Sequence, residues 1–236
     1  MPITAASVKR ELKAVAKPEK AAFYPSFFKA GPGEYGEGDR FLGVVVPDQR
    51  KIARKYRELS RPELDKLLSD PFHECRLTGL FILVHQFERT TDSRSRKEVV
   101  DYYLSKSSSV NNWDLVDASS HKILGAWLCK QTNRKILYRL GRSKCLWEQR
   151  IAMVATYALI KNGEFDETLV LAEQMLDHPH DLIHKATGWM LREVGKQNPA
   201  ILDTFLNQHA ASMPRTMLRY SIEKLSPSKR KHFMDL

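Results

Sequence analysis

The amino-acid sequence predicts an all-α fold in which pairs of helices stack into a solenoid. Three observations support this prediction. Apolar residues recur at helical spacing over most of the 236 residues, the alternation typical of strands is nearly absent, and one motif recurs along the chain. No Pro- or Ser-rich linker interrupts the pattern, so we expect residues 1–236 to form a single domain.

Long amphipathic segments account for most of the expected helices. The run from Pro71 to Phe87 predicts a helix with an apolar face, and the run from Asn111 to Gln131 predicts another that begins at Asn111 or Asn112 as its cap. Further helices are expected over Trp147–Ile160, Leu182–Val194, Arg94–Leu104, Asn133–Arg139 and Glu167–Leu176. Leu42–Val46 is the one strand candidate, and Pro47 ends it.

A repeat appears when these helices are laid over one another, because each opens with polar residues and then turns apolar and small. The aligned positions are Arg76, Trp113, Arg150, Lys185 and Arg219, with spacings of 37, 37, 35 and 34 residues. A period of this length built from helix pairs is typical of an α-solenoid, in which equivalent residues project towards the same side. Four of the five aligned residues are cationic, which predicts a cationic row along a concave groove.

The charge balance also suggests a polyanionic partner. Lys and Arg total 38 against 28 acidic residues, which gives a formal net charge of +10. An excess of this size favours nucleic acid, although a basic surface kept for solubility is the alternative. The chain has no stretch of about 18 uninterrupted apolar residues and no apolar leader, and its three cysteines form no CxxC pair. We therefore expect a cytoplasmic protein that does not enter a membrane.

Trp113 and Asp117 lie four residues apart and so share one face of a helix. Trp189 follows Lys185 by four residues and is the repeat equivalent of Asp117. Each residue alone has an ordinary explanation: tryptophans are core residues, Asp117 interacts with the helix dipole or with His121, and Arg150 connects neighbouring repeats. Their alignment across three successive repeats favours a functional site.

The segments that carry these residues resemble those of a known family. The runs VNNWDLVD (110–117), LWEQR (146–150), KATGWMLRE (185–193) and FFKAGPGEYGEGDRFLGVVVP (27–47) resemble the AlkD-type alkylpurine DNA glycosylases of the DNA alkylation repair family. The resemblance covers most of the chain in order. It implies a right-handed α-solenoid of HEAT-like repeats whose concave groove binds duplex DNA. A monomer is expected, since that is the default for such arrays.

The resemblance also assigns roles. It implies that Asp117 is the catalytic carboxylate, that Trp113 and Trp189 flank the deoxyribose of the lesion, and that Arg150 holds a nearby phosphate. An aromatic residue near the N-terminus is expected to contribute, and Tyr24, Phe27 and Phe28 remain open as candidates. Further contacts to the DNA backbone are expected from Arg76, Lys185, Arg192 and Arg219.

The chemistry of alkylated purines fits one carboxylate. Alkylation at N3 or N7 places a positive charge on the base, which then leaves without protonation by a second acid. Positive charge develops on the sugar, where Asp117 stabilises it and activates water, while indole faces attract cations. We expect a monofunctional glycosylase that leaves an abasic site. Lys185 is a candidate amine nucleophile by proximity only, and we assign it to a phosphate instead.

Two other patterns carry little weight. Gly31-Pro-Gly-Glu-Tyr-Gly36 matches GxGxxG, but no strand precedes it and no βαβ unit follows. His178, His180 and His184 resemble a metal cluster, but Pro179 interrupts the helix and no cysteine has ligand spacing. We expect no metal and no cofactor.

Three other functions remain as alternatives to the glycosylase. The main one is a catalytically silent HEAT-like protein that recognises damaged or unusual DNA structure. A protein–protein scaffold predicts a groove less cationic than this repeat row suggests, and an enzyme acting on free nucleosides requires a closed pocket. The placement of Asp117 between two tryptophans favours catalysis on DNA.

Overall fold

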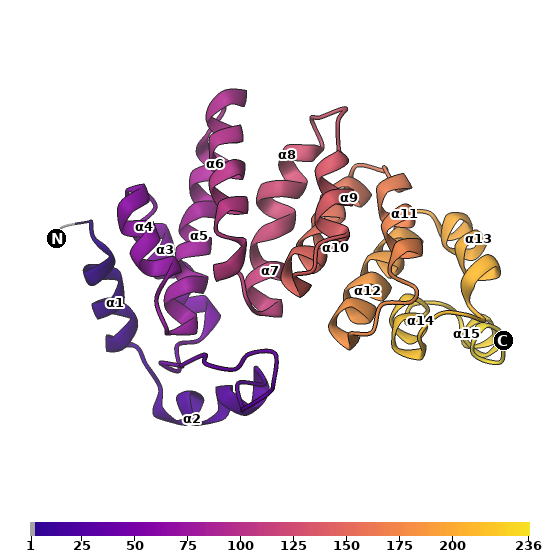
Figure 1. The fold of residues 1–236 in the computed structure, drawn as a ribbon, viewed down its shortest axis with the longest axis horizontal. Coiled ribbons are helices and arrows are strands. Elements are labelled where there is room, and N and C mark those ends of the chain that lie inside the picture. The colour runs from indigo at the N-terminus through magenta and orange to yellow at the C-terminus, as the bar shows by residue number, and fades with distance from the viewer. Residues whose placement is uncertain (1–2) are drawn as a thin grey trace. The chain divides into compact units, whose positions relative to one another are not determined.

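A computed structural model describes residues 3–236, and within that range it contains helices and no strand. Close contacts divide the chain into two compact units, and the first ends at Ser119 and the second begins at Ser120. Within each unit, helices pack in pairs on their neighbours in the sequence, as the α-solenoid prediction requires (Figure 1). The prediction that residues 1–236 form one domain remains a prediction.

The first unit is built around one long buried helix. It comprises α1 (Ala5–Ala14), α2 (Pro18–Phe27), α3 (Val46–Lys55), α4 (Arg61–Leu68), α5 (His73–Arg89), α6 (Ser93–Ser105), the 3₁₀ turn η1 (Ser107–Ser109) and most of α7 (Trp113–Ser120). Helices α1, α3 and α4 pack on α5 from one side, and α6 packs on it too. Because α5 has neighbours on several sides, Ile82 and Leu83 are buried together with the apolar face that the sequence predicts.

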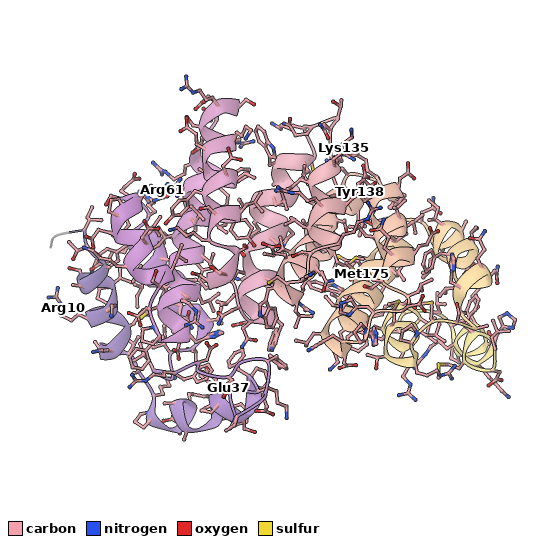
Figure 2. All side chains as sticks on the ribbon, viewed as in Figure 1. Arg10, Glu37, Arg61, Lys135, Tyr138 and Met175 are labelled. Carbon is pink, nitrogen blue, oxygen red and sulfur yellow. The ribbon has the colours of Figure 1, made fainter. Side chains whose placement is uncertain are left out.

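The second unit repeats one arrangement three times. It contains η2 (His121–Gly125), α8 (Ala126–Leu128), α9 (Lys135–Gly141), α10 (Leu146–Lys161), α11 (Asp166–Gln174), α12 (Asp181–Gln197), α13 (Pro199–His209), α14 (Arg215–Ser221) and α15 (Pro227–Met234). Helices α10, α12 and α14 pack side by side as one layer, while α9, α11 and α13 each pack on a member of that layer. Met175, labelled in Figure 2, is buried where α11 ends and accepts a hydrogen bond from Thr187 of α12.

The expected helices agree with the structure within a few residues at each end. One predicted helix is not a regular α-helix throughout. The run Asn111–Gln131 consists of α7, a π-helical turn at η2 and the short α8. Gly125 ends the π turn, and a Cβ there would lie 2.3 Å from the carbonyl oxygen of Ala155 in α10. The π turn is thus held against α10 at a distance that only glycine permits.

The strand predicted over Leu42–Val46 is wrong. Val46 is the first residue of α3, and the residues before it are extended without a partner strand. Their backbone N–H groups are satisfied by a side chain instead: the buried carboxylate of Glu74 accepts hydrogen bonds from Leu42, Gly43 and Val44 at 2.7–3.2 Å. Because a side chain of α5 accepts the backbone N–H groups of this segment, these groups do not require a partner strand.

Candidate active site

The first unit presents Trp113 and Asp117 one turn apart on α7. Asn112 directly precedes the helix: its Oδ1 accepts the N–H of Trp113 at 2.8 Å, and its Nδ2 donates to the carbonyl of Phe28 at 3.5 Å. Of the two residues that the sequence left open as the cap, Asn112 is the one at the N-cap position. Both Trp113 and Asp117 are only partly buried, so their side chains retain access to solvent.

The indole of Trp113 rests on aromatic side chains from the end of α2. Phe28 lies nearly parallel to it, with ring centroids 5.5 Å apart, and Phe27 meets it edge-on at 5.7 Å. Phe28 is buried, whereas 48% of the surface of Phe27 is exposed. Tyr24 packs on Phe28 and Phe41 instead. Of the three aromatic candidates, Phe27 is thus the one that combines exposure with contact to Trp113.

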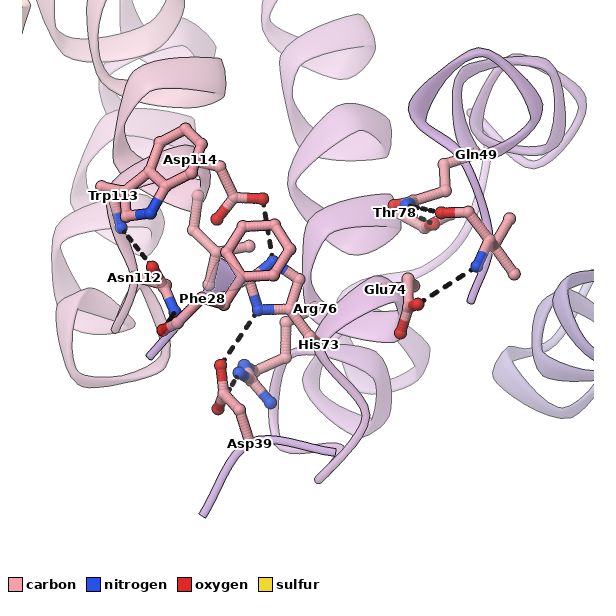
Figure 3. A network of polar contacts seen from close by, with 12 residues as sticks. Phe28, Asp39, Gln49, His73, Glu74, Arg76, Thr78, Asn112, Trp113 and Asp114 are labelled. Carbon is pink, nitrogen blue, oxygen red and sulfur yellow. Dashed lines mark hydrogen bonds and ion pairs between the residues drawn. The ribbon is translucent and has the colours of Figure 1, made fainter. Parts of the chain in front are cut away.

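A buried histidine links this aromatic cluster to α7. The imidazole of His73 contacts Asp39 through Nδ1 at 3.0 Å and Asp114 through Nε2 at 2.8 Å (Figure 3). The ring lies 4.6 Å from that of Phe28 and 5.3 Å from that of Phe41. Asp114 is the second residue of α7, so these contacts join the loop after α2, the start of α5 and the start of the helix that carries Trp113 and Asp117.

The charges in this cluster stabilise one another. Burial opposes protonation of His73, but the charges and hydrogen bonds of Asp114 and Asp39 outweigh that effect and raise the pKa of His73 to about 9. Burial likewise opposes ionisation of Asp39, yet His73 and Arg76 hold its pKa below the usual value. We call His73, Asp39 and Asp114 the imidazolium clamp, since at neutral pH a cation lies between two carboxylates.

Arg76 is part of this cluster rather than an exposed cation. Its Nη2 lies 2.5 Å from Asp39, its Nη1 donates to the carbonyl of Asp70 at 2.9 Å, and only 7% of the side chain is exposed. The sequence predicts that Arg76 contacts the DNA backbone. The structure gives its guanidinium two protein partners, which favours a role in positioning Asp39.

The second unit carries the other predicted site residues on α10 and α12. Arg150 is buried, and its Nη1 donates to the carbonyl of Leu182 at 2.5 Å, which ties α10 to the first turn of α12. Trp189 is partly buried, with its ring centroid 6.0 Å from that of Tyr157. Tyr157 in turn meets His121 of the π turn edge-on at 5.4 Å. The result is an aromatic row of His121, Tyr157 and Trp189.

The predicted backbone contacts of the second unit differ in availability. Lys185 forms an ion pair with Asp181 at 2.7 Å on the same helix. Arg192 pairs with Glu223 of the α14 region and lies close to Glu193, so it connects α12 to its neighbour. Arg219 is exposed on α14. Arg219 therefore fits the predicted role best, because it forms no ion pair with any residue of the described range 3–236.

The sequence patterns do not single out His73, Asp114, Tyr157 or Phe41. Tyr157 carried a usable signal, since it lies seven residues after Arg150 and thus two turns along the same face of α10. Asp114 and His73 are separated by 41 residues in the sequence, and no pattern links them. Among the described residues 3–236, no group of three or more His, Cys, Asp or Glu side chains is arranged to hold a metal ion, and no helix is long and apolar enough to cross a membrane.

Comparison with known proteins supports the fold and the family. The structure is similar to that of a chain described as a predicted DNA alkylation repair enzyme from Enterococcus faecalis, with a TM-score of 0.67 and 17% sequence identity over 90% of this chain and 97% of that one. No curated protein matches the sequence. Residues 8–225 match the family described as DNA alkylation repair enzyme. The chain therefore belongs to the DNA alkylation repair enzyme family.

Proposed function

We propose that this protein is a monofunctional DNA glycosylase that hydrolyses the N-glycosidic bond of cationic N3- or N7-alkylated purines in duplex DNA. The observation that supports this most is the pair formed by Trp113 and Asp117 on α7, an accessible indole and a carboxylate one turn apart. A duplex DNA substrate agrees with the family and with the net charge of +10.

In this proposal Asp117 acts on the deoxyribose. The bond between C1′ and the purine nitrogen breaks, and its electron pair neutralises the positive charge of the alkylated base. Positive charge appears on the sugar, where the carboxylate of Asp117 stabilises it. Water then adds to C1′, and its proton passes to Asp117 or to solvent, which leaves an abasic site. The base is already a good leaving group, so one carboxylate suffices.

Trp113 is proposed to form one wall of this site, with Phe27 beside it. An indole face attracts a cation by roughly 0.5–2 kcal/mol, depending on desolvation. Phe28 behind the indole and the clamp at the start of α7 hold Trp113 in one orientation. A fixed wall of this kind favours both the cationic lesion and the cationic transition state over a neutral adduct.

Trp189 is proposed to contribute a second aromatic face, supported by Tyr157. Arg150 is proposed to contact a backbone phosphate with the 4% of its surface that is exposed. Lys185 and Arg219 are proposed as further backbone contacts. Arg192 is proposed as a weaker one, because Glu223 already neutralises it.

The proposal is tested by release of base from a duplex that contains one N7-methylguanine. Wild-type protein and the Asp117→Asn variant are compared at saturating protein, and alkali converts abasic sites into strand breaks. Wild-type release with a fall of about 10-fold or more in the variant supports the proposal, since a positioned catalytic group contributes at least that much. A duplex with a neutral adduct is the selectivity control.

Two outcomes contradict the proposal. Release no faster than the spontaneous rate, with duplex binding intact, leaves the alternative of a catalytically silent protein that recognises damaged DNA. Equal release by wild type and Asp117→Asn assigns the chemistry to another group. The isosteric substitution keeps the size of the side chain, so the thermal midpoint of the variant identifies any loss that is merely structural.

A further inference from the structure

The positive charge of this chain is concentrated in one segment. Residues 120–147 contain seven Lys or Arg and no Asp or Glu, so this segment alone accounts for +7 of the formal +10. The segment runs from the π turn through α9 to the first turn of α10. Its cations therefore set most of the electrostatic character of the second unit.

Two of the seven cations are not exposed. Arg134 is largely buried and pairs with Glu164 at 2.5 Å and with Glu167 at 3.0 Å. Lys122 lies in the π turn and is partly buried. Because Arg134 engages these two glutamates, the acidic side chains that face α9 from the α11 region are already neutralised in part. Asp166, the first residue of α11, is the remaining acid whose charge reaches Tyr138 of α9.

The other five cations are exposed on and beside α9. They are Lys130, Lys135, Arg139, Arg142 and Lys144, and none forms an ion pair with any residue of the described range 3–236. We call these five, together with Tyr138, the α9 surface. Lys135, Tyr138, Arg139 and Arg142 line a shallow pocket on it, and Lys135 and Tyr138 can be located in Figure 2.

Three exposed cations elsewhere on the chain differ in this respect. Lys66 pairs with Glu63, Lys97 pairs with Asp101, and Arg94 lies 3.5 Å from Glu98, each on the same helix. A cation with its own carboxylate gains little from a phosphate, because that carboxylate must first be released. The unpaired cations of the α9 surface have no such cost.

The spacing on α9 matches a phosphate backbone. Lys135, Arg139 and Arg142 are four and three residues apart, so they lie on one face of the helix. They span roughly 10 Å at about 1.5 Å per residue. Duplex DNA carries one phosphate per roughly 3.4 Å of axis on each strand, so α9 placed parallel to the duplex axis spans about three phosphates of one strand.

We propose that the α9 surface binds the phosphate backbone of duplex DNA, as a contact separate from the candidate active site. Helix α9 packs on α10 from outside the layer that holds Arg150, Lys185 and Trp189, so it adds a second place where DNA is held. The contact is independent of base sequence and of damage, because it involves only the backbone. It retains the protein on DNA between lesions. This inference goes beyond the proposed glycosylase activity and does not require it.

The test compares two triple variants with the same loss of charge. The first is Lys135→Gln/Arg139→Gln/Arg142→Gln, and the matched control is Lys66→Gln/Arg94→Gln/Lys97→Gln, which removes cations that already have carboxylate partners. Binding to a fluorescent, undamaged 25-base-pair duplex is measured from 50 to 200 mM NaCl. Loss of three phosphate contacts lowers the slope of log K against log salt by roughly 2.7 and weakens binding on the order of 10-fold at the lowest salt.

The control variant is expected to bind like wild type, with both thermal midpoints unchanged because all six side chains are exposed. The conservative variant Lys135→Arg/Arg139→Lys/Arg142→Lys is expected to bind like wild type as well. Equal affinity and equal salt slope for the two Gln triples overturn the proposal. Weakened binding to an RNA hairpin of similar length, with duplex DNA binding intact, overturns it in favour of an RNA contact.

The two proposals fail in different ways. Base release at saturating protein is expected to be unchanged in the α9 triple, because none of the three residues belongs to the candidate active site. If wild-type protein releases no base, the binding measurement still tests whether the α9 surface binds DNA. If the α9 triple variant binds DNA like wild type, the comparison of wild type with Asp117→Asn still tests the proposed glycosylase activity.

Discussion

The imidazolium clamp predicts that the stability of the first unit depends on pH in a specific window. The pKa of His73 is about 9 in the folded protein and 6.5 in an unfolded chain, so the folded state binds the proton more tightly. The resulting stabilisation is fully present below pH 6.5 and is lost as the pH rises through 9. Loss of the proton leaves Asp39 and Asp114 beside a neutral ring, with Arg76 as the remaining cation on Asp39.

The size of this effect follows from the two pKa values. One pKa unit corresponds to about 1.4 kcal/mol, so the step from 6.5 to about 9 amounts to roughly 3 kcal/mol. Solvent screening reduces this little, because the side chains of His73 and Asp39 are 2% and 3% exposed and that of Asp114 is 15% exposed. The effect is thus a large fraction of the stability of an ordinary domain.

Two measurements test the clamp. The ring proton of His73, assigned by its absence in His73→Gln, is expected to titrate by NMR near pH 9. Urea unfolding of wild type and His73→Gln from pH 6 to pH 10 is expected to show a free-energy difference that shrinks by roughly 3 kcal/mol. Other groups titrate equally in both proteins and cancel. A midpoint at or below 6.5, or a difference that does not change with pH, refutes the reasoning.

Two further substitutions test the surroundings of the site. Phe27→Ala is expected to leave the thermal midpoint nearly unchanged, since Phe27 is 48% exposed. It is expected to slow single-turnover base release about 2- to 5-fold, because roughly 0.5–1 kcal/mol of cation–π attraction is lost. An unchanged rate of base release shows that Phe27 does not belong to the site. Glu74→Ala leaves three N–H groups without their carboxylate and is expected to lower the free energy of unfolding by several kcal/mol. A fall in the free energy of unfolding of less than 1 kcal/mol, measured by urea titration, contradicts that account of the segment before α3.

Local periodicity was enough to predict most of the helices and the residues on which the proposed chemistry depends. The apolar residues of α5, α10 and α12 recur at helical spacing within short stretches of sequence, and helix formation depends on such nearby residues. The same holds for the turn that places Asp117 behind Trp113. The repeat and the family resemblance came from the order of these segments, and the family match over residues 8–225 confirms the resemblance.

Tertiary structure decided which charged groups are available. The repeat aligned Arg76 with cations expected along a groove, but Asp39 lies 37 residues earlier in the sequence and neutralises it. The segment from Leu42 to Val46 looked like a strand because its hydrogen-bond partner, Glu74, belongs to a helix about 30 residues away. Partners such as these are brought together only when the chain packs, so no local pattern records them.

The choice among Tyr24, Phe27 and Phe28 also depends on tertiary packing. All three are aromatic and lie within five residues, and the sequence does not rank them. Packing on Trp113, which lies about 85 residues later, buries Phe28 and leaves Phe27 at the surface. The sequence by itself determined the helices and the pairing of an indole with a carboxylate, because both depend on spacing within one turn. Burial and ion pairing depend on distant segments, and only the folded structure decided them.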